Sequence, residues 1–152
     1  MPAGAFVFPD KAKLNFFSAT DLLNPANVFK ITLHTSTWVP ANATNEVYAD
    51  ATNELATGFG YTAGGITLTG VALTQTAGVV KFTSAAAVWT AAGGSIPAWR
   101  WGVVRAFGTL NAKVDPIVGY FLGDTTPADV PATTTTNTLT VTPSASGIAT
   151  AT

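Results

Sequence analysis

Residues 66–83 read ITLTGVALTQTAGVVKFT and decide the fold class. Apolar side chains alternate with threonine at the start of this run, and the apolar phase shifts by one residue after Gly70. Strict alternation is typical of a half-buried strand, and a phase shift at glycine is typical of a β-bulge. Residues 76–78 supply a turn, after which the alternation resumes. We therefore predict a β-hairpin formed by residues 66–75 and 79–83.

Strand patterns recur along the rest of the chain. Further strands are predicted at residues 29–34, 98–107, 116–122 and 137–142. In the first of them His34 falls on the wetter side, and in the second Trp99, Trp101 and Val103 share a face that we expect to be core. The abundant threonine supports the assignment, because β-branched residues favour strands. The spacing predicts a mainly β fold, an antiparallel β-sandwich with a jelly-roll-like arrangement.

Two short helices complete the expected architecture. One covers residues 11–19 with Asp10 as its cap, and the other covers residues 45–55. No change in composition divides the strand-rich part into two folding units. We predict an N-terminal segment at residues 1–28 and a single β-sandwich domain at residues 29–152.

The composition argues against several classes of protein. Hydrophobic residues make up 47% of the chain and charged residues only 10%, whereas about 25% charged is usual for globular proteins. Seven Lys and Arg against eight Asp and Glu give a net charge of -1, which leaves no basic patch for nucleic-acid phosphates. The absence of cysteine excludes disulfides and thiolate metal sites. The charge-free runs 55–80 and 130–152 contain too much threonine and glycine for a membrane span, so neither nucleic acid nor membrane is expected as a partner.

An enzyme needs side chains that titrate or coordinate, and this sequence offers few. His34 is the single histidine, and nothing in the sequence signals a partner for proton transfer, so we favour a partly exposed strand histidine. Glu46, Asp50 and Glu54 recur every four residues and could form a metal-binding stripe, but a solvated helix face is the simpler interpretation. We therefore predict no enzymatic activity, no catalytic or metal site and no cofactor.

Glycine-rich loops and tryptophans could also indicate ligands. The glycines at 58–65 match no nucleotide-binding motif, so we expect them to serve turns. At least one glycine of each pair, at 64–65 and at 93–94, is predicted to have a positive φ. The tryptophans could form a carbohydrate platform, yet aromatic residues at alternating strand positions usually belong to the core. They are Trp38, Trp89, Trp99 and Trp101.

Four stretches, in this order, resemble a family of small structural proteins often encoded beside the major capsid protein of tailed bacteriophages. They are FKITL at 29–33, GYTAGG at 60–65, WTAAGGSI at 89–96 and DPIVGY at 115–120. The resemblance implies a virion protein that is made in the host cytoplasm and sits on the head surface. There it would bind the major capsid protein and neighbouring copies of itself and stabilise the shell as a cement or decoration protein. The alternatives are a tail structural protein, such as a tail-tube subunit, and a carbohydrate- or host-binding β module.

The N-terminal segment has no counterpart that we can match to this family. It places four aromatic rings in a proline-punctuated stretch outside the strand pattern. We predict that these rings contact the capsid, where burial of each ring would contribute a few kcal/mol at about 25 cal/mol per Å². The alternative is that they pack against their own domain. The candidate residues are Phe6, Phe8, Phe16 and Phe17.

Overall fold

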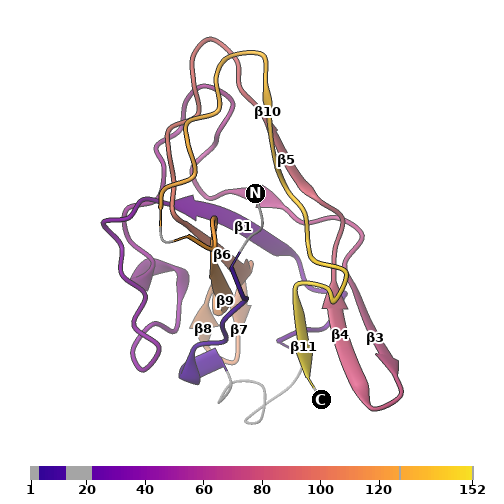
Figure 1. Cartoon of the computed structure of the whole chain (residues 1–152). Coiled ribbons are helices and arrows are strands. Elements are labelled where there is room, and N and C mark those ends of the chain that lie inside the picture. The colour runs from indigo at the N-terminus through magenta and orange to yellow at the C-terminus, as the bar shows by residue number, and fades with distance from the viewer. Residues whose placement is uncertain (1–3, 13–21, 127, 152) are drawn as a thin grey trace.

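The fold is mainly β, as the alternation of the sequence predicts. A computed structural model describes residues 4–12, 22–126 and 128–151. Strand accounts for 41% of the described residues and helix for 4%, and every strand pairing among them is antiparallel. Figure 1 shows the sheets packed around a central group of strands, an arrangement consistent with a β-sandwich. The strand orders do not establish the jelly-roll arrangement.

A four-stranded sheet forms the centre of the molecule, with the order β2-β1-β6-β9. Its strands are β1 (Phe29–His34), β2 (Ile66–Thr67), β6 (Trp101–Ala106) and β9 (Ile117–Leu122). The register of β6 and β9 shifts between Val104 and Arg105, so that Val118 is an extra residue in β9. Such a bulge changes which side chains of a strand face the core.

Three smaller sheets surround the central one. A three-stranded sheet has the order β11-β4-β3, and two further sheets pair β10 with β5 and β7 with β8. Their strands are β3 (Ala72–Thr76), β4 (Val79–Thr83), β5 (Ala87–Thr90), β7 (Thr109–Leu110), β8 (Lys113–Val114), β10 (Thr138–Val141) and β11 (Ala149–Ala151). In Figure 1, β3, β4 and β11 lie side by side, and β5 and β10 run together away from them.

The central sheet is buried on both faces. One face contributes Phe29, Leu33 and Phe121 to the main core, which also contains Phe82 from β4 and Trp89 from β5. The other face forms a second cluster, in which side chains of β6 and β9 pack against the irregular segment between β1 and β2. That cluster consists of Trp38, Ala51, Val103, Ile117 and Tyr120, with Val7 and Trp101 packed against it.

The hairpin prediction is right for its second half and wrong for its first. The strands β3 and β4 form a hairpin around Ala77 and Gly78, as predicted. Residues 66–75 are not one bulged strand, however, because β2 ends at Thr67 and pairs with β1, whereas β3 belongs to a different sheet. Gly70 has a φ of 60° and lies where the chain crosses between the two sheets. The phase shift therefore marks a corner between sheets.

The second predicted helix is reduced to one turn. A 3-10 helix covers Tyr48–Asp50, and the remainder of 45–55 is irregular. The carboxylate of Asp50 accepts the backbone N–H groups of Glu46 and Val47, which are thereby satisfied without a continuous helix. Residues 10–12 are helical, so that Asp10 begins the turn, and residues 13–19 of the first predicted helix lie outside the described residues.

The glycine prediction is confirmed at both pairs. Gly64, Gly65 and Gly93 have φ values of 90°, 70° and 70°. Gly65 also lies close to β1, because a Cβ placed on it would lie 2.0 Å from the carbonyl oxygen of Ile31. Only a residue without a side chain allows this approach.

Replacing Gly65 by alanine is expected to destabilise the fold more than the same change at Gly78. Gly78 has a φ of 83° and nothing within 4 Å of its added Cβ, so Gly78→Ala should cost only the left-handed conformation, about 1–2 kcal/mol. Gly65→Ala adds a clash with β1. Urea unfolding of both variants measures the difference, and equal losses would show that the close approach to β1 is not needed.

Candidate functional site

The N-terminal segment lies along the edge of the central sheet. The N–H groups of Gly4 and Val7 donate to the carbonyls of Leu122 and Tyr120 at 2.8 Å each, and the N–H of Tyr120 returns a bond to Val7 at 3.0 Å. Residues 4–7 thus run antiparallel to β9. This segment covers an edge that would otherwise expose unpaired backbone groups.

Phe6 is seated in a notch that glycine creates. A Cβ on Gly119 would lie 2.2 Å from the Phe6 ring, so the ring occupies the place of that missing side chain. The ring also stacks on Phe121 with centroids 6.4 Å apart, and Phe8 meets it edge-on at 5.3 Å. Phe121 itself covers Gly102 in the same manner. Two glycines on neighbouring strands therefore seat two successive rings.

The structure places two of the four predicted capsid-contact residues. Phe6 and Phe8 are half-buried and pack against the main core, which is the arrangement that we gave as the alternative. Phe16 and Phe17 lie outside the described residues. Both rings are partly exposed, so a contact between them and a capsid stays a prediction.

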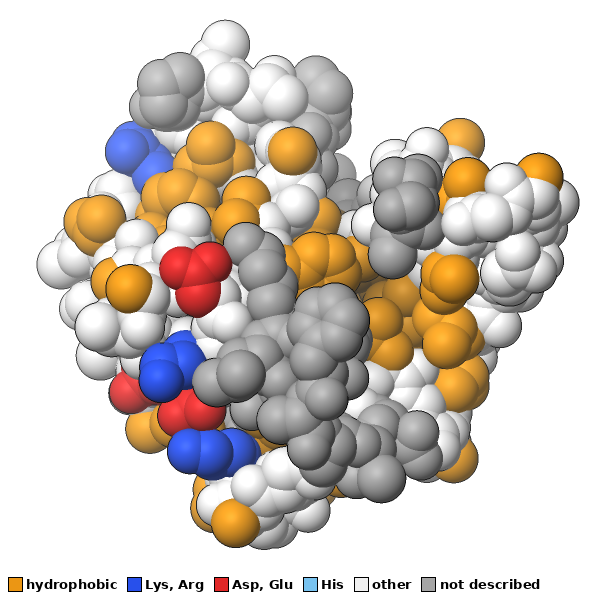
Figure 2. All heavy atoms as spheres, turned by 90° about the horizontal axis from the view of Figure 1, so that it is seen from below, with side chains coloured by type: hydrophobic (Ala, Val, Ile, Leu, Met, Phe, Trp, Pro, Cys, Tyr) orange, Lys and Arg blue, Asp and Glu red, His pale blue; other side chains and the backbone are white. Residues whose placement is uncertain are grey.

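An apolar cavity of about 430 Å³ lies beside the N-terminal segment. It separates one face of the central sheet from the segments around β5 and β10. Figure 2 shows hydrophobic side chains gathered beside a hollow on this side of the molecule. The walls include Ala5, Phe6, Ile31, Leu68, Val104, Phe121, Val141 and Ile148. The N-terminal segment supplies one wall of this partly open cavity, so displacing the segment would expose the cavity further.

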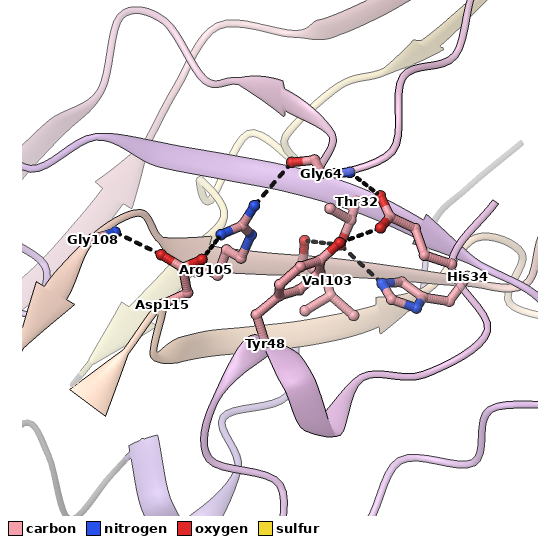
Figure 3. A network of polar contacts seen from close by, with 9 residues as sticks. Thr32, His34, Tyr48, Gly64, Val103, Arg105, Gly108 and Asp115 are labelled. Carbon is pink, nitrogen blue, oxygen red and sulfur yellow. Dashed lines mark hydrogen bonds and ion pairs between the residues drawn. The ribbon is translucent and has the colours of Figure 1, made fainter. Parts of the chain in front are cut away.

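The opposite face of the central sheet carries a buried polar network, part of which is drawn in Figure 3. The carboxylate of Glu54 accepts hydrogen bonds from the hydroxyls of Tyr48 and Tyr61 and from the N–H of Gly64, the last two at 2.6 and 2.8 Å. The Tyr61 hydroxyl also accepts the N–H of Leu33 at 3.0 Å. Burial, followed by the bond to Glu54, raises the pKa of both tyrosines above their usual range. These hydroxyls therefore act as donors and not as acids.

Arg105 ties the same loop to the far end of the sheet. Its side chain is only 3% exposed and forms an ion pair with Asp115. It also donates to the carbonyl of Gly64 at 3.0 Å and lies 3.9 Å from the centre of the Tyr48 ring (Figure 3). The second oxygen of Asp115 accepts the N–H of Gly108 at 2.6 Å. A buried guanidinium with this many partners fixes geometry, because removing one partner leaves an uncompensated charge.

His34 is fully buried, which corrects the expectation of a partly exposed histidine. Its Nδ1 lies 2.8 Å from the Thr52 carbonyl, which can only accept, so this nitrogen carries the proton. Nε2, 2.9 Å from Oγ1 of Thr32, then accepts the hydroxyl proton. Burial lowers the pKa of His34, with smaller opposing contributions from the Thr52 carbonyl and Glu54. The alternation predicted the wrong exposure for His34 because the segment after β1 folds back over the sheet face on which His34 lies.

The three carboxylates do not line one solvated helix face, because only Tyr48–Asp50 are helical in this segment. Glu46 pairs with Lys113 at 3.0 Å, Asp50 binds two backbone N–H groups, and Glu54 belongs to the network above. No group of three or more metal-ligating side chains is found within residues 4–12, 22–126 and 128–151. Each carboxylate instead satisfies polar groups of the irregular segment.

Three of the four tryptophans belong to the core, as predicted, whereas Trp101 is only partly buried and packs against the second cluster. Trp38, Trp89 and Trp99 are at most 3% exposed, and Trp101 is half-buried beside Trp38 and Tyr120. Trp99 contributes to the main core, whereas Trp101 and Val103 pack on the second cluster, so the three do not share one face as expected. No tryptophan offers an open stacking platform for a sugar ring.

The four stretches that carry the family resemblance meet in space. Tyr61 bonds to the backbone of β1 and stacks on Trp89 with centroids 6.1 Å apart. Arg105 joins the Gly64 carbonyl to Asp115. The loop 60–65 therefore connects the other three stretches, at 29–33, 89–96 and 115–120. These contacts lie within the chain and stabilise its fold.

No protein-family model matches the chain, and no curated protein or solved structure resembles it significantly. Among the described residues, no helix is both long and apolar enough to span a membrane.

Acid is expected to destabilise the protein through His34. Its pKa is lowered in the folded state, so below a pH of about 6.5 the unfolded chain binds a proton that the folded chain resists. Stability should be complete above that pH and decline as the pH falls, with a slope approaching about 1.4 kcal/mol per pH unit for one proton. Urea unfolding from pH 7.5 to 5 tests this, with His34→Gln as the control. An identical pH slope in that variant would contradict the assignment.

The seat of Phe6 can be tested by a double-mutant cycle. Gly119→Ala should destabilise the protein because the new Cβ would lie 2.2 Å from the Phe6 ring and 2.6 Å from the Val7 carbonyl oxygen. In a Phe6→Ala background only the clash with the Val7 carbonyl remains, so the same change should cost less. We expect a coupling of at least about 1 kcal/mol in thermal unfolding. Additive losses would mean that Phe6 does not occupy the notch.

Proposed function

We propose that this chain is a structural protein of a tailed-phage particle that binds the outside of the capsid and stabilises it. The observation that carries the proposal is the ordered set of four stretches that resemble capsid-associated proteins and that converge on one loop. On this proposal the partners are the major capsid protein and neighbouring copies of the chain on the lattice. The site of action is the head surface, after synthesis in the host cytoplasm.

The charge of the chain suits a protein that is repeated many times on a shell. A net charge of -1 keeps the repulsion between neighbouring copies small. Apolar side chains that are at least two-fifths exposed are distributed over the surface and offer contact points for a lattice. They are Val28, Val39, Phe59, Leu73, Val88, Phe107 and Val114.

The polar network supports a structural role over a catalytic one. His34 is neutral and has both ring nitrogens engaged, Glu54 accepts three hydrogen bonds, and Arg105 is paired with Asp115. None of these groups lines the apolar cavity. A catalytic group must lie within hydrogen-bond distance of a substrate proton. His34, Glu54 and Arg105 instead bind other groups of the chain.

The proposal predicts saturable binding to heads that lack the protein. Purified chain is mixed with such heads, and the bound fraction is measured by co-sedimentation while head rupture is followed by thermal melting. We expect a fixed ratio of bound chain to capsid protein and a higher rupture temperature. Absence of binding, with polymerisation into tubes, would favour a tail protein, and a shift of tryptophan emission on glycan titration would favour a sugar-binding module.

The contribution of the N-terminal segment is separated by deleting residues 1–12. Circular dichroism first establishes that the shortened domain folds, because the deletion uncovers β9 and the cavity. A lattice contact through Phe6 and Phe8 predicts a folded domain that no longer adds to heads. Full occupancy and protection by the shortened chain would assign the contact to the loops of the sandwich.

A further inference from the structure

The three-stranded sheet ends at β3. With the order β11-β4-β3, no strand among the described residues pairs with the outer side of β3 (Figure 1). Four of its five residues are exposed, and the fifth is half-buried. Edge strands are usually protected by charged side chains, proline or bulges. The run 66–80 contains none of the charged residues or prolines.

The hairpin geometry determines which N–H and C=O groups of β3 do not bond to β4. Ala77 and Gly78 both have positive φ, at 50° and 83°, as in a two-residue type I′ turn. Thr76 and Val79 therefore form the hydrogen-bonded pair that closes the turn, and such pairs alternate along the hairpin. The N–H and C=O groups of Leu73 and Gln75 consequently point away from β4.

The outward N–H and C=O groups of β3 can pair with the same groups of a second copy of β3. When a second β3 approaches in the antiparallel direction, Leu73 of one copy faces Gln75 of the other, and Gln75 faces Leu73. The two-fold axis then passes between the two Thr74 residues, which form a non-hydrogen-bonded pair. No like charges are opposed across the axis, and threonine pairs are favourable neighbours on a sheet.

The side chains of β3 also favour pairing with a second copy. Leu73 pairs with Phe82 of β4, so it lies on the core-facing side of the hairpin, yet it is 42% exposed. A second copy would continue the sheet and cover this side chain. Thr74 lies on the other side of the hairpin, where its neighbour on β4 is Lys81.

We infer that two copies of the chain associate through β3, which joins their three-stranded sheets into one six-stranded antiparallel sheet. This interface is isologous and closes after two copies. It leaves the N-terminal segment and the central sheet free. The inference does not depend on binding to a capsid, since it concerns the chain alone in solution.

The test uses charge across the two-fold axis. Sedimentation equilibrium of the full chain, at concentrations up to about 1 mM, should show a dimer. Thr74→Lys and Thr74→Glu should each be monomeric, because like charges then face each other, and an equimolar mixture should form the heterodimer. A monomeric wild type, or a dimer that persists in both variants, would overturn the inference.

A backbone test complements the charge test. Gln75→Pro removes an N–H that points away from β4, so the hairpin should keep its internal bonds while the dimer is lost. Gln75→Ala keeps that N–H and should remain dimeric. Circular dichroism confirms that both variants fold. Should the wild type be monomeric while Thr74→Lys weakens binding to heads, the edge would accept a capsid strand, and the dimer would be refuted while the proposed function stands.

Discussion

The partly buried carboxylate of Glu54 makes the interaction on which the rest of the structure depends. The central sheet is buried on both faces, and other sheets cover only one of them. An irregular segment between β1 and β2 covers the other, and its backbone groups must find partners away from water. Glu54 binds Tyr48, Tyr61 and Gly64 at once, which holds this segment in place and lets Gly65 approach β1.

The network connects the stretches 60–65, 89–96 and 115–120, which lie far apart in the sequence. Tyr61 and Trp89 stack, and Arg105 bridges the Gly64 carbonyl to Asp115, so that distant parts of the sequence depend on one loop. A domain with 10% charged residues places some of its few ionisable groups in this buried cluster. Such an allocation favours a fixed shape.

The sequence pattern predicted the β class, the β3–β4 hairpin, β9 and β10, because each of these segments is a short apolar or alternating run bounded by turn residues. The prediction was wrong where the same sequence pattern can arise from two different structures. His34 lies on a strand that is buried on both faces, and only the fold of the following segment places Thr52 against it. The phase shift at Gly70 is common to a bulge and to a corner between sheets. The seat of Phe6 depends on Gly119, more than one hundred residues away, and no local pattern announces it.

The central claim is that the chain binds the outer surface of a phage head. A reconstruction of the particle that carries this protein tests it most directly, because the position of the density requires no assumption about the contact residues. We expect density for a 15.5 kDa β domain at regularly repeated sites outside the capsid shell, joined to the major capsid protein. Density for the chain only in the tail, or none on the particle, would contradict it.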